Sequence, residues 1–304
     1  MAALVPRAEP QNPCTCVFWK RHFGTDALVG SYLFLFSSIV YLAYAVYLVL
    51  TDTSTTMAAV MSWGNLTSAT GFFIGSVYFC KLSYPEVGVA MVTRALREDA
   101  SEMSWTTKYF THNEMLIAIW GFQLGFAPYF VIAAFYAYYG DYSAAAAYGV
   151  STVLLMGLMG FWLVAAMPHN MQRNGGQGSS YFYDAVCCCP RRGSPSEAFW
   201  RTHLGSDFLA GSWIFCVTGV LATLGVLAAV WEDPDSLVAW CVFLSTAPFG
   251  VGSVLFVRSA YPSTANSSIC GGPLSYDEED HRDAGWTTPD ANQKAPLLAK
   301  MSRA

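Results

Sequence analysis

The chain has few charged residues for its length. Only 12% of its 304 residues are charged and 54% are hydrophobic, whereas a soluble domain carries roughly 25% charged residues. This shortage excludes an ordinary water-soluble protein. The formal net charge is −5 and no segment is strongly basic, so the chain offers no face suited to nucleic acid, which is bound through clustered Lys and Arg.

Six segments lack Lys, Arg, Asp and Glu altogether. Each has the length of roughly 20 residues that a helix needs to cross the ~30 Å hydrocarbon layer of a bilayer. We predict transmembrane helices at residues 27–50, 57–80, 115–139, 143–167, 208–231 and 237–257. The expected fold class is an all-α integral membrane protein with six spans. The N-terminal residues do not resemble a cleaved signal peptide, so the first span would direct insertion.

Three of the loops between these spans contain neither Lys nor Arg. All 16 of those residues lie in the N-terminal tail, the second and fourth loops or the C-terminal tail. Because the side rich in Lys and Arg faces the cytosol, both termini are predicted to be cytosolic. The other three loops would face the opposite side, and their carboxylates belong to Asp52, Asp141, Glu232, Asp233 and Asp235.

The sequence contains an internal repeat. FWKRHFGTDALVGSYLF at Phe18–Phe34 returns as FWRTHLGSDFLAGSWIF at Phe199–Phe215, and GSVYFCKLSYP at Gly75–Pro85 returns as GSVLFVRSAYP at Gly252–Pro262. The first and third helical hairpins are therefore predicted to be duplicates. Self-similarity of this kind indicates that one structural unit is used several times.

A fainter third copy lies between them. EMLIAIWGF at Glu114–Phe122 aligns with the two hairpin openings, and His112 and Met167-Pro168 extend the match. Units with an even number of spans all enter the membrane from the same side, which predicts a parallel repeat packed as a pseudo-threefold ring. The predicted organisation is an N-terminal tail (1–17), hairpin 1 (18–85), a cytosolic loop with an interfacial helix (86–111), hairpin 2 (112–168), a Cys- and Gly-rich loop (169–198), hairpin 3 (199–262) and a disordered tail (263–304).

These hairpins resemble the YrhK-like membrane domain. The shared features are an acidic residue followed by Leu, Gly and Phe at the opening, and Gly-Ser, an aromatic and a basic residue at the close; they cover Asp26–Pro85 and Asp207–Pro262. In the middle hairpin Ala118 and Ile119 replace the opening Gly-Ser, and the closing Gly-Ser is missing. The family has no established activity, so the resemblance implies a fold and no chemistry.

A histidine precedes the acidic residue at the start of each predicted hairpin. Thr25 and Ser206 have the side chains that cap helix N-termini, and the acidic residue after each cap suits the helix dipole. We favour this capping role. The alternative is a metal or proton site, for which the candidate ligands are His22, Asp26, His203 and Asp207.

No ionisable residue lies near the middle of any predicted span. A transport pathway usually has such a residue, because an intramembrane charge is costly and is kept for a function. The candidate polar pore residues are Asn65 and Gln123. The alternative is that they form hydrogen bonds between helices.

The nine cysteines avoid the three acidic loops, which excludes structural disulfides there. The cytosolic cysteines are candidates for palmitoylation, and a zinc site or free thiols are the alternatives; they include Cys14, Cys16, Cys187, Cys188 and Cys189. Leu297 and Leu298 resemble a dileucine sorting signal, although Gln293 stands where an acidic residue is expected. This signal would place the protein in a eukaryotic endomembrane or the plasma membrane.

No nucleophile and base pair, phosphate-binding glycine loop or metal-hydrolase motif is present, so we expect no enzyme activity and no cofactor. The first hypothesis is a structural or partner-binding membrane protein whose interaction surface is cytosolic. The second is an uncoupled channel or transporter for a small or neutral solute along the axis between the hairpins. The expected partners are the lipid bilayer and cytosolic proteins, and the sequence leaves the oligomeric state open.

Overall fold

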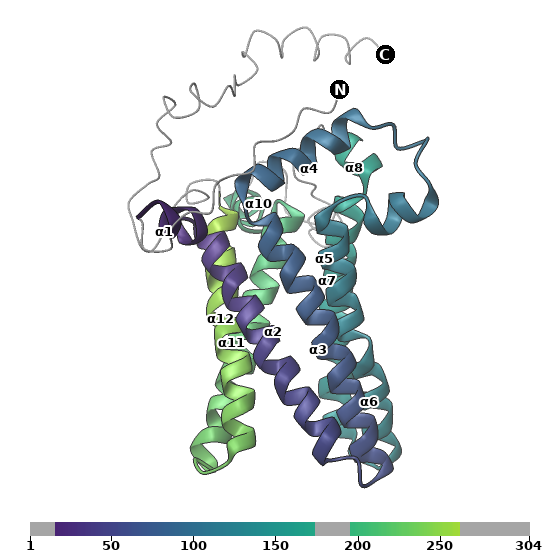
Figure 1. Cartoon of the computed structure of the whole chain (residues 1–304), viewed down its shortest axis with the longest axis vertical. Coiled ribbons are helices and arrows are strands. Elements are labelled where there is room, and N and C mark those ends of the chain that lie inside the picture. Colours follow the sequence, from purple (N-terminus) through teal and green to yellow (C-terminus); the bar gives the residue numbers. More distant parts are fainter. Residues whose placement is uncertain (1–15, 174–194, 262–304) are drawn as a thin grey trace, which may run out of the picture.

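A computed structural model describes residues 16–173 and 195–261, and these residues form helices without any β-strand (Figure 1). The helices are α1 (Cys16–Phe23), α2 (Asp26–Thr51), α3 (Thr56–Leu82), α4 (Pro85–Arg97), a π-helical turn η1 (Thr107–Thr111), α5 (Glu114–Phe126), α6 (Pro128–Tyr138), α7 (Tyr142–Ala166), α8 (Pro168–Arg173), α10 (Pro195–Leu204), α11 (Asp207–Glu232) and α12 (Leu237–Ala260).

The long helices make the chain a multipass membrane protein. Five described helical stretches are long and apolar enough to cross a membrane, and they are Asp26–Thr51, Glu114–Tyr138, Tyr142–Ala166, Asp207–Glu232 and Leu237–Ala260. These stretches coincide with five of the six predicted spans. The remaining predicted span forms α3, which has 27 residues but is less apolar and is not among the five.

The long helices surround a common axis as three helix pairs. The pairs are α2 with α3, the α5 and α6 stretch with α7, and α11 with α12. Each pair also packs on the next, through α3 on α5, α7 on α11 and α12 on α2, so the ring closes. The contact of α7 with α11 is the least extensive of these junctions. The short helices α1, α4, α8 and α10 lie together at one end of the ring (Figure 1), which we call the collar end.

Capping side chains begin every long helix. The predicted caps at Thr25 and Ser206 are confirmed, because their hydroxyl oxygens accept hydrogen bonds from the N–H groups of Leu28 and Leu209. Asn113, which the sequence reasoning missed, caps the Glu114 helix in the same way. At the opposite end of the ring, Thr55, Asp141 and Ser236 cap α3, α7 and α12.

Glycine pairs set the spacing at the α3–α5 junction. A Cβ atom added to Gly71 would lie 2.4 Å from the backbone nitrogen of Gly125, and one added to Gly121 would lie 2.6 Å from that of Gly75. No side chain fits at such distances, so these glycines allow the two helices to pack closely. Gly157 and Gly160 on α7 differ, because nothing lies within 4 Å of an added Cβ there.

Pro128 divides the third predicted span into α5 and α6, as its inability to donate a backbone hydrogen bond requires. Ser68 on α3 meets one of the carbonyls near this break by donating a hydrogen bond to Gly125 at 2.6 Å. The freed backbone is therefore partly satisfied by a neighbouring helix, which is how membrane helices tolerate proline. Pro248 lies inside a continuous α12.

Candidate functional site

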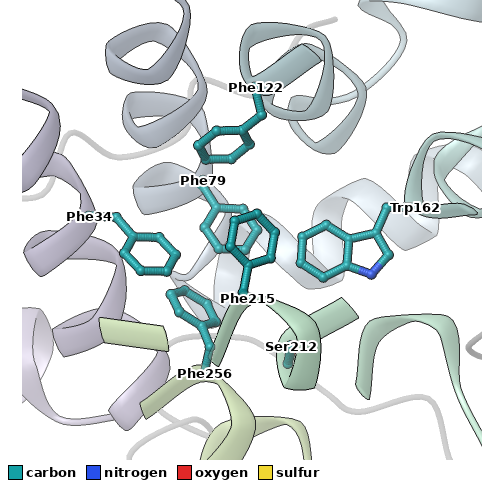
Figure 2. Close-up of a pocket in the computed structure, with 7 residues that line it drawn as sticks. All are labelled: Phe34, Phe79, Phe122, Trp162, Ser212, Phe215 and Phe256. Carbon is teal, nitrogen blue, oxygen red and sulfur yellow. The ribbon is translucent and has the colours of Figure 1, made fainter. Parts of the chain in front are cut away.

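An aromatic layer fills the axis of the ring. Each of the six long helices contributes one ring to it, from Phe34, Phe79, Phe122, Trp162, Phe215 and Phe256 (Figure 2). All six side chains are at most 4% exposed. The positions lie in the half of the ring nearer the collar end, because Phe34, Phe122 and Phe215 follow helix starts at that end while the other three precede helix ends there.

The rings of this layer contact one another around the axis. Ring centroids lie 4.7 Å apart for Phe79 and Phe256, and 5.0 Å apart for Phe34 and Phe256. On the other side of the axis, Trp162 lies 5.5 Å from Phe215. The space left between the rings is about 10 Å³, barely enough for one water molecule, which needs at least about 10–15 Å³ and polar partners. The layer therefore leaves no room for a column of water or solute.

The sequence contains a signal for this layer that the sequence reasoning did not use. Phe34, Phe122 and Phe215 each lie eight residues after the acidic residue that opens a helix pair. Phe79, Trp162 and Phe256 each lie six residues before the proline that follows a pair. The equal spacing in the three helix pairs was visible in the sequence, but an aromatic residue in an apolar span is too common to identify the layer alone.

Two ion pairs join neighbouring helix pairs at the collar end. Arg258 Nε on α12 lies 3.0 Å from Asp26 Oδ2 on α2, and Lys81 Nζ on α3 lies 2.8 Å from Glu114 Oε1 on α5. The side chain of Asp26 is fully buried. At the third junction the connection is a hydrogen bond instead, which Trp162 Nε1 donates to the carbonyl oxygen of Asp207 at 2.6 Å.

Two matching histidine and tyrosine contacts attach α1 and α10 to the ring. His22 Nδ1 lies 2.5 Å from Tyr84 Oη, and His203 Nδ1 lies 2.5 Å from Tyr261 Oη. Trp213 Nε1 donates to the Tyr261 oxygen at 3.0 Å, so the tyrosine proton is available for His203. The third histidine, His112, has a carboxylate partner instead of a tyrosine, because its Nε2 lies 3.2 Å from Glu98 Oε2.

These contacts place the candidate metal ligands with other partners. His22 and His203 each bind a tyrosine, and Asp26 binds Arg258. Within residues 16–173 and 195–261, no three His, Cys, Asp or Glu side chains are grouped as a metal site would require. The geometry therefore supports an architectural role for His22, Asp26 and His203, and Asp207 joins the ring through its backbone carbonyl.

The candidate pore residues Asn65 and Gln123 are held in separate hydrogen-bond groups. Tyr41 donates to Asn65 Oδ1 at 2.7 Å and its hydroxyl lies 3.0 Å from that of Tyr129. Gln123 Nε2 donates to the carbonyl oxygen of Met156 at 3.1 Å. Among the described residues, Gln123 Oε1 is the buried side-chain oxygen without a hydrogen-bond partner. Both residues thus form the hydrogen bonds between helices that were the alternative to a pore lining.

Several predicted modification sites fall outside the described residues. These are Cys14, the cysteines at 187–189 and the leucines at 297 and 298. Cys16 is the first residue of α1, and its side chain is likewise outside the description. Cys80, Cys216 and Cys241 are free thiols on the long helices.

The collar helices expose aromatic and apolar side chains. On α1 and α10, Trp19, Phe199 and Trp200 are exposed, and on α4, Val89 and Leu96 are exposed. The second predicted loop contains α4. Its buried Ala95 packs towards α8, and Gln172 donates a hydrogen bond to the Ala95 carbonyl oxygen at 2.8 Å.

Comparison with known proteins adds no relative, because no protein-family model, curated protein or solved structure matches the chain.

Proposed function

We propose that the chain is a non-enzymatic membrane scaffold of six spans, built from three hairpin repeats, with both termini in the cytosol and a partner-binding surface on the collar. In this proposal α3 is the sixth span. Its lower hydropathy reflects polar residues that bond to other helices, such as Ser68 to Gly125 and Ser76 to Ser38. The resemblance to YrhK-like hairpins belongs to the same proposal.

The aromatic layer is the observation that carries this proposal. A solute moving along the axis would have to displace six buried rings, one from every long helix. Rings packed in this way stabilise the ring of helices, since aromatic pairs add roughly 0.5–1.5 kcal/mol beyond the apolar area that they bury. A closed axis and exposed collar helices suit a protein that acts through its surface.

Matched contacts support the three-hairpin arrangement. The caps at Thr25, Asn113 and Ser206 stand at equivalent positions of the three pairs, and the aromatic layer takes two rings from each pair. The basic residues of the collar end support its cytosolic placement, because Lys and Arg are retained on the cytosolic side.

A second candidate function is conduction of a small or neutral solute, with the layer as a closed gate. The Tyr41, Asn65 and Tyr129 group and the unpartnered Gln123 oxygen favour it. Purified protein in liposomes separates the two functions. The scaffold predicts no flux of ions, glycerol or urea above that of empty liposomes. Flux that Asn65→Leu or Gln123→Leu abolishes would establish the channel and reject the scaffold.

Photo-crosslinking tests the proposed collar surface. A photoreactive residue at Val89, which is 62% exposed on α4, should form one or a few discrete adducts in cells that overexpress the protein. The same residue at Val150, which is 59% exposed on the membrane part of α7, should form lipid adducts only. Protein adducts of equal yield at both positions would reject a partner-binding surface specific to the collar.

A further inference from the structure

A groove separates α2 from α12 in the half of the ring away from the collar. Its volume is about 470 Å³, within the ~300–1,000 Å³ of typical small-molecule sites. Ile39, Ala43 and Tyr47 line it from α2, and Val238 and Cys241 line it from α12. The lining is apolar apart from tyrosine hydroxyls and one thiol, so the groove suits a hydrocarbon ligand.

The groove exists because α2 and α12 are joined at one end only. Near the collar, an added Cβ on Gly252 would lie 2.8 Å from the carbonyl oxygen of Gly30, so the two backbones nearly touch. Farther along, Ser37 donates a hydrogen bond to the carbonyl oxygen of Ser245. Beyond this point the helices diverge towards the end opposite the collar (Figure 1).

The length of the groove matches one leaflet of a bilayer. Ser37 closes one end and Tyr47 lines the other, and these residues are ten positions apart on α2. Ten helical residues span ~15 Å at ~1.5 Å per residue, which is half of the ~30 Å hydrocarbon thickness. A chain that enters from the far surface would therefore fill the groove and stop at the Ser37 and Ser245 contact.

The charges at the open end select the headgroup. The two loops that adjoin α2 and α12 at this end expose Asp52, Asp233 and Asp235, with Glu232 beside them, and contain no Lys or Arg. An anionic headgroup would be repelled, whereas a headgroup carrying a quaternary ammonium or an amine would be attracted.

We propose that the groove between α2 and α12 binds one acyl chain of a zwitterionic phospholipid from the leaflet opposite the collar. The chain fills the wedge between the two helices and keeps their diverging ends apart. Val150 and Leu154 on α7 are also exposed apolar side chains, but they lie outside this groove, so labelling at α7 measures general lipid contact.

Photoreactive phospholipids test this site in liposomes that contain the full-length protein. Phosphatidylcholine with a diazirine on one acyl chain is irradiated, and the adducts are mapped by mass spectrometry. We expect adducts at residues 39–47 and 237–241 to exceed those at residues 146–154 at least fivefold. Phosphatidylglycerol with the same chain should label the groove at least threefold less. Adducts spread evenly over all exposed helices, or equal labelling by the two lipids, would overturn the proposal.

Filling the groove provides the matched variants. Ala43→Trp should remove most of the groove adducts, whereas Val150→Trp, on the exposed face of α7 outside this groove, should leave them unchanged. If Ala43→Trp does not elute as a single species in gel filtration, Val238→Trp serves the same purpose from α12. Groove adducts that persist in a well-folded filling variant would overturn the proposal.

Discussion

Two of the three junctions between helix pairs are built in one way and the third in another. At α12–α2 and α3–α5, a glycine on one helix lies against the backbone of the other, and an ion pair closes the collar end. At α7–α11, Gly211 faces the indole of Trp162, and the same indole donates a hydrogen bond to the Asp207 backbone. The first design packs backbones closely, and the second uses one large side chain as a spacer.

Sequence position explains the difference. Gly75 and Gly252 lie ten residues before a proline, where α7 has Leu158 before Pro168. Lys81 and Arg258 lie four residues before that proline, where α7 has Val164. At these positions α7 therefore has neither the small residue nor the cation, and its junction is the least extensive of the three. All three helix pairs nevertheless place an aromatic residue six residues before the proline, and these rings fill the axis.

Glycine substitution should give the largest contrast between the junctions. Gly121→Leu forces a side chain into the Gly75 backbone at 2.6 Å, and we expect the free energy of unfolding to fall by about 3 kcal/mol, or the folded protein to be lost altogether. Gly157→Leu, where the added Cβ meets nothing within 4 Å, should change stability little. Thermal unfolding in detergent followed by size-exclusion chromatography measures both. Equal melting temperatures would show that close backbone packing does not distinguish the junctions.

Removing the cation of an ion pair should give the second largest decrease in the free energy of unfolding. Arg258→Met leaves the fully buried Asp26 without this partner, while the stem still covers apolar surface. We expect a loss of about 2–3 kcal/mol, less than for a fully buried pair because the Arg258 side chain is 42% exposed.

Lys81→Met is the matched control for Arg258→Met. The side chain of Lys81 is 54% exposed and that of Glu114 is 14% exposed, so water can compensate part of the loss, and we expect about 1 kcal/mol or less. Chemical unfolding in mixed detergent micelles compares the two variants. A larger loss for Lys81→Met would contradict the importance assigned to the buried carboxylate.

Trp162→Phe tests the spacer at the third junction. The variant keeps a ring in the aromatic layer but removes the N–H that bonds to the Asp207 carbonyl oxygen. We expect a loss of about 1–2 kcal/mol, since a buried carbonyl group loses its donor. Trp231→Phe, at a tryptophan that is 86% exposed, should have no measurable effect. Indistinguishable unfolding midpoints for the two variants would show that the Trp162 indole does not stabilise the α7–α11 junction.

Val164→Lys should change the free energy of unfolding least. The variant places a cation on α7 at the position that Lys81 and Arg258 occupy on α3 and α12. We expect a gain of at most about 0.5 kcal/mol, because a partly exposed ion pair contributes little. Val164→Met, which has similar length and no charge, separates packing from electrostatics. A loss of more than about 1 kcal/mol for the lysine variant alone would show that this position is not equivalent to Lys81 and Arg258.

Much of the fold was predictable from the sequence, because uncharged segments of membrane length and capping residues are local signals. Five of the spans and the caps at Thr25 and Ser206 needed no information about neighbours. The aromatic layer and the Arg258 to Asp26 ion pair were not predicted, because they join residues far apart in the chain. The glycines on α7 show that a small residue in a span does not by itself identify a helix junction, because nothing lies within 4 Å of an added Cβ at Gly157 or Gly160.

Cysteine accessibility tests most directly the central claim that three hairpins enter the membrane from the collar side. The variants are Asp52→Cys, Asp141→Cys, Asp235→Cys and Glu86→Cys, each made in a chain whose nine native cysteines are replaced by serine, and this cysteine-free chain is the control. A membrane-impermeant maleimide added to intact cells should label the first three variants, and Glu86→Cys only after permeabilisation. Labelling of Glu86→Cys from outside, or protection of any of the other three, would contradict the six-span arrangement.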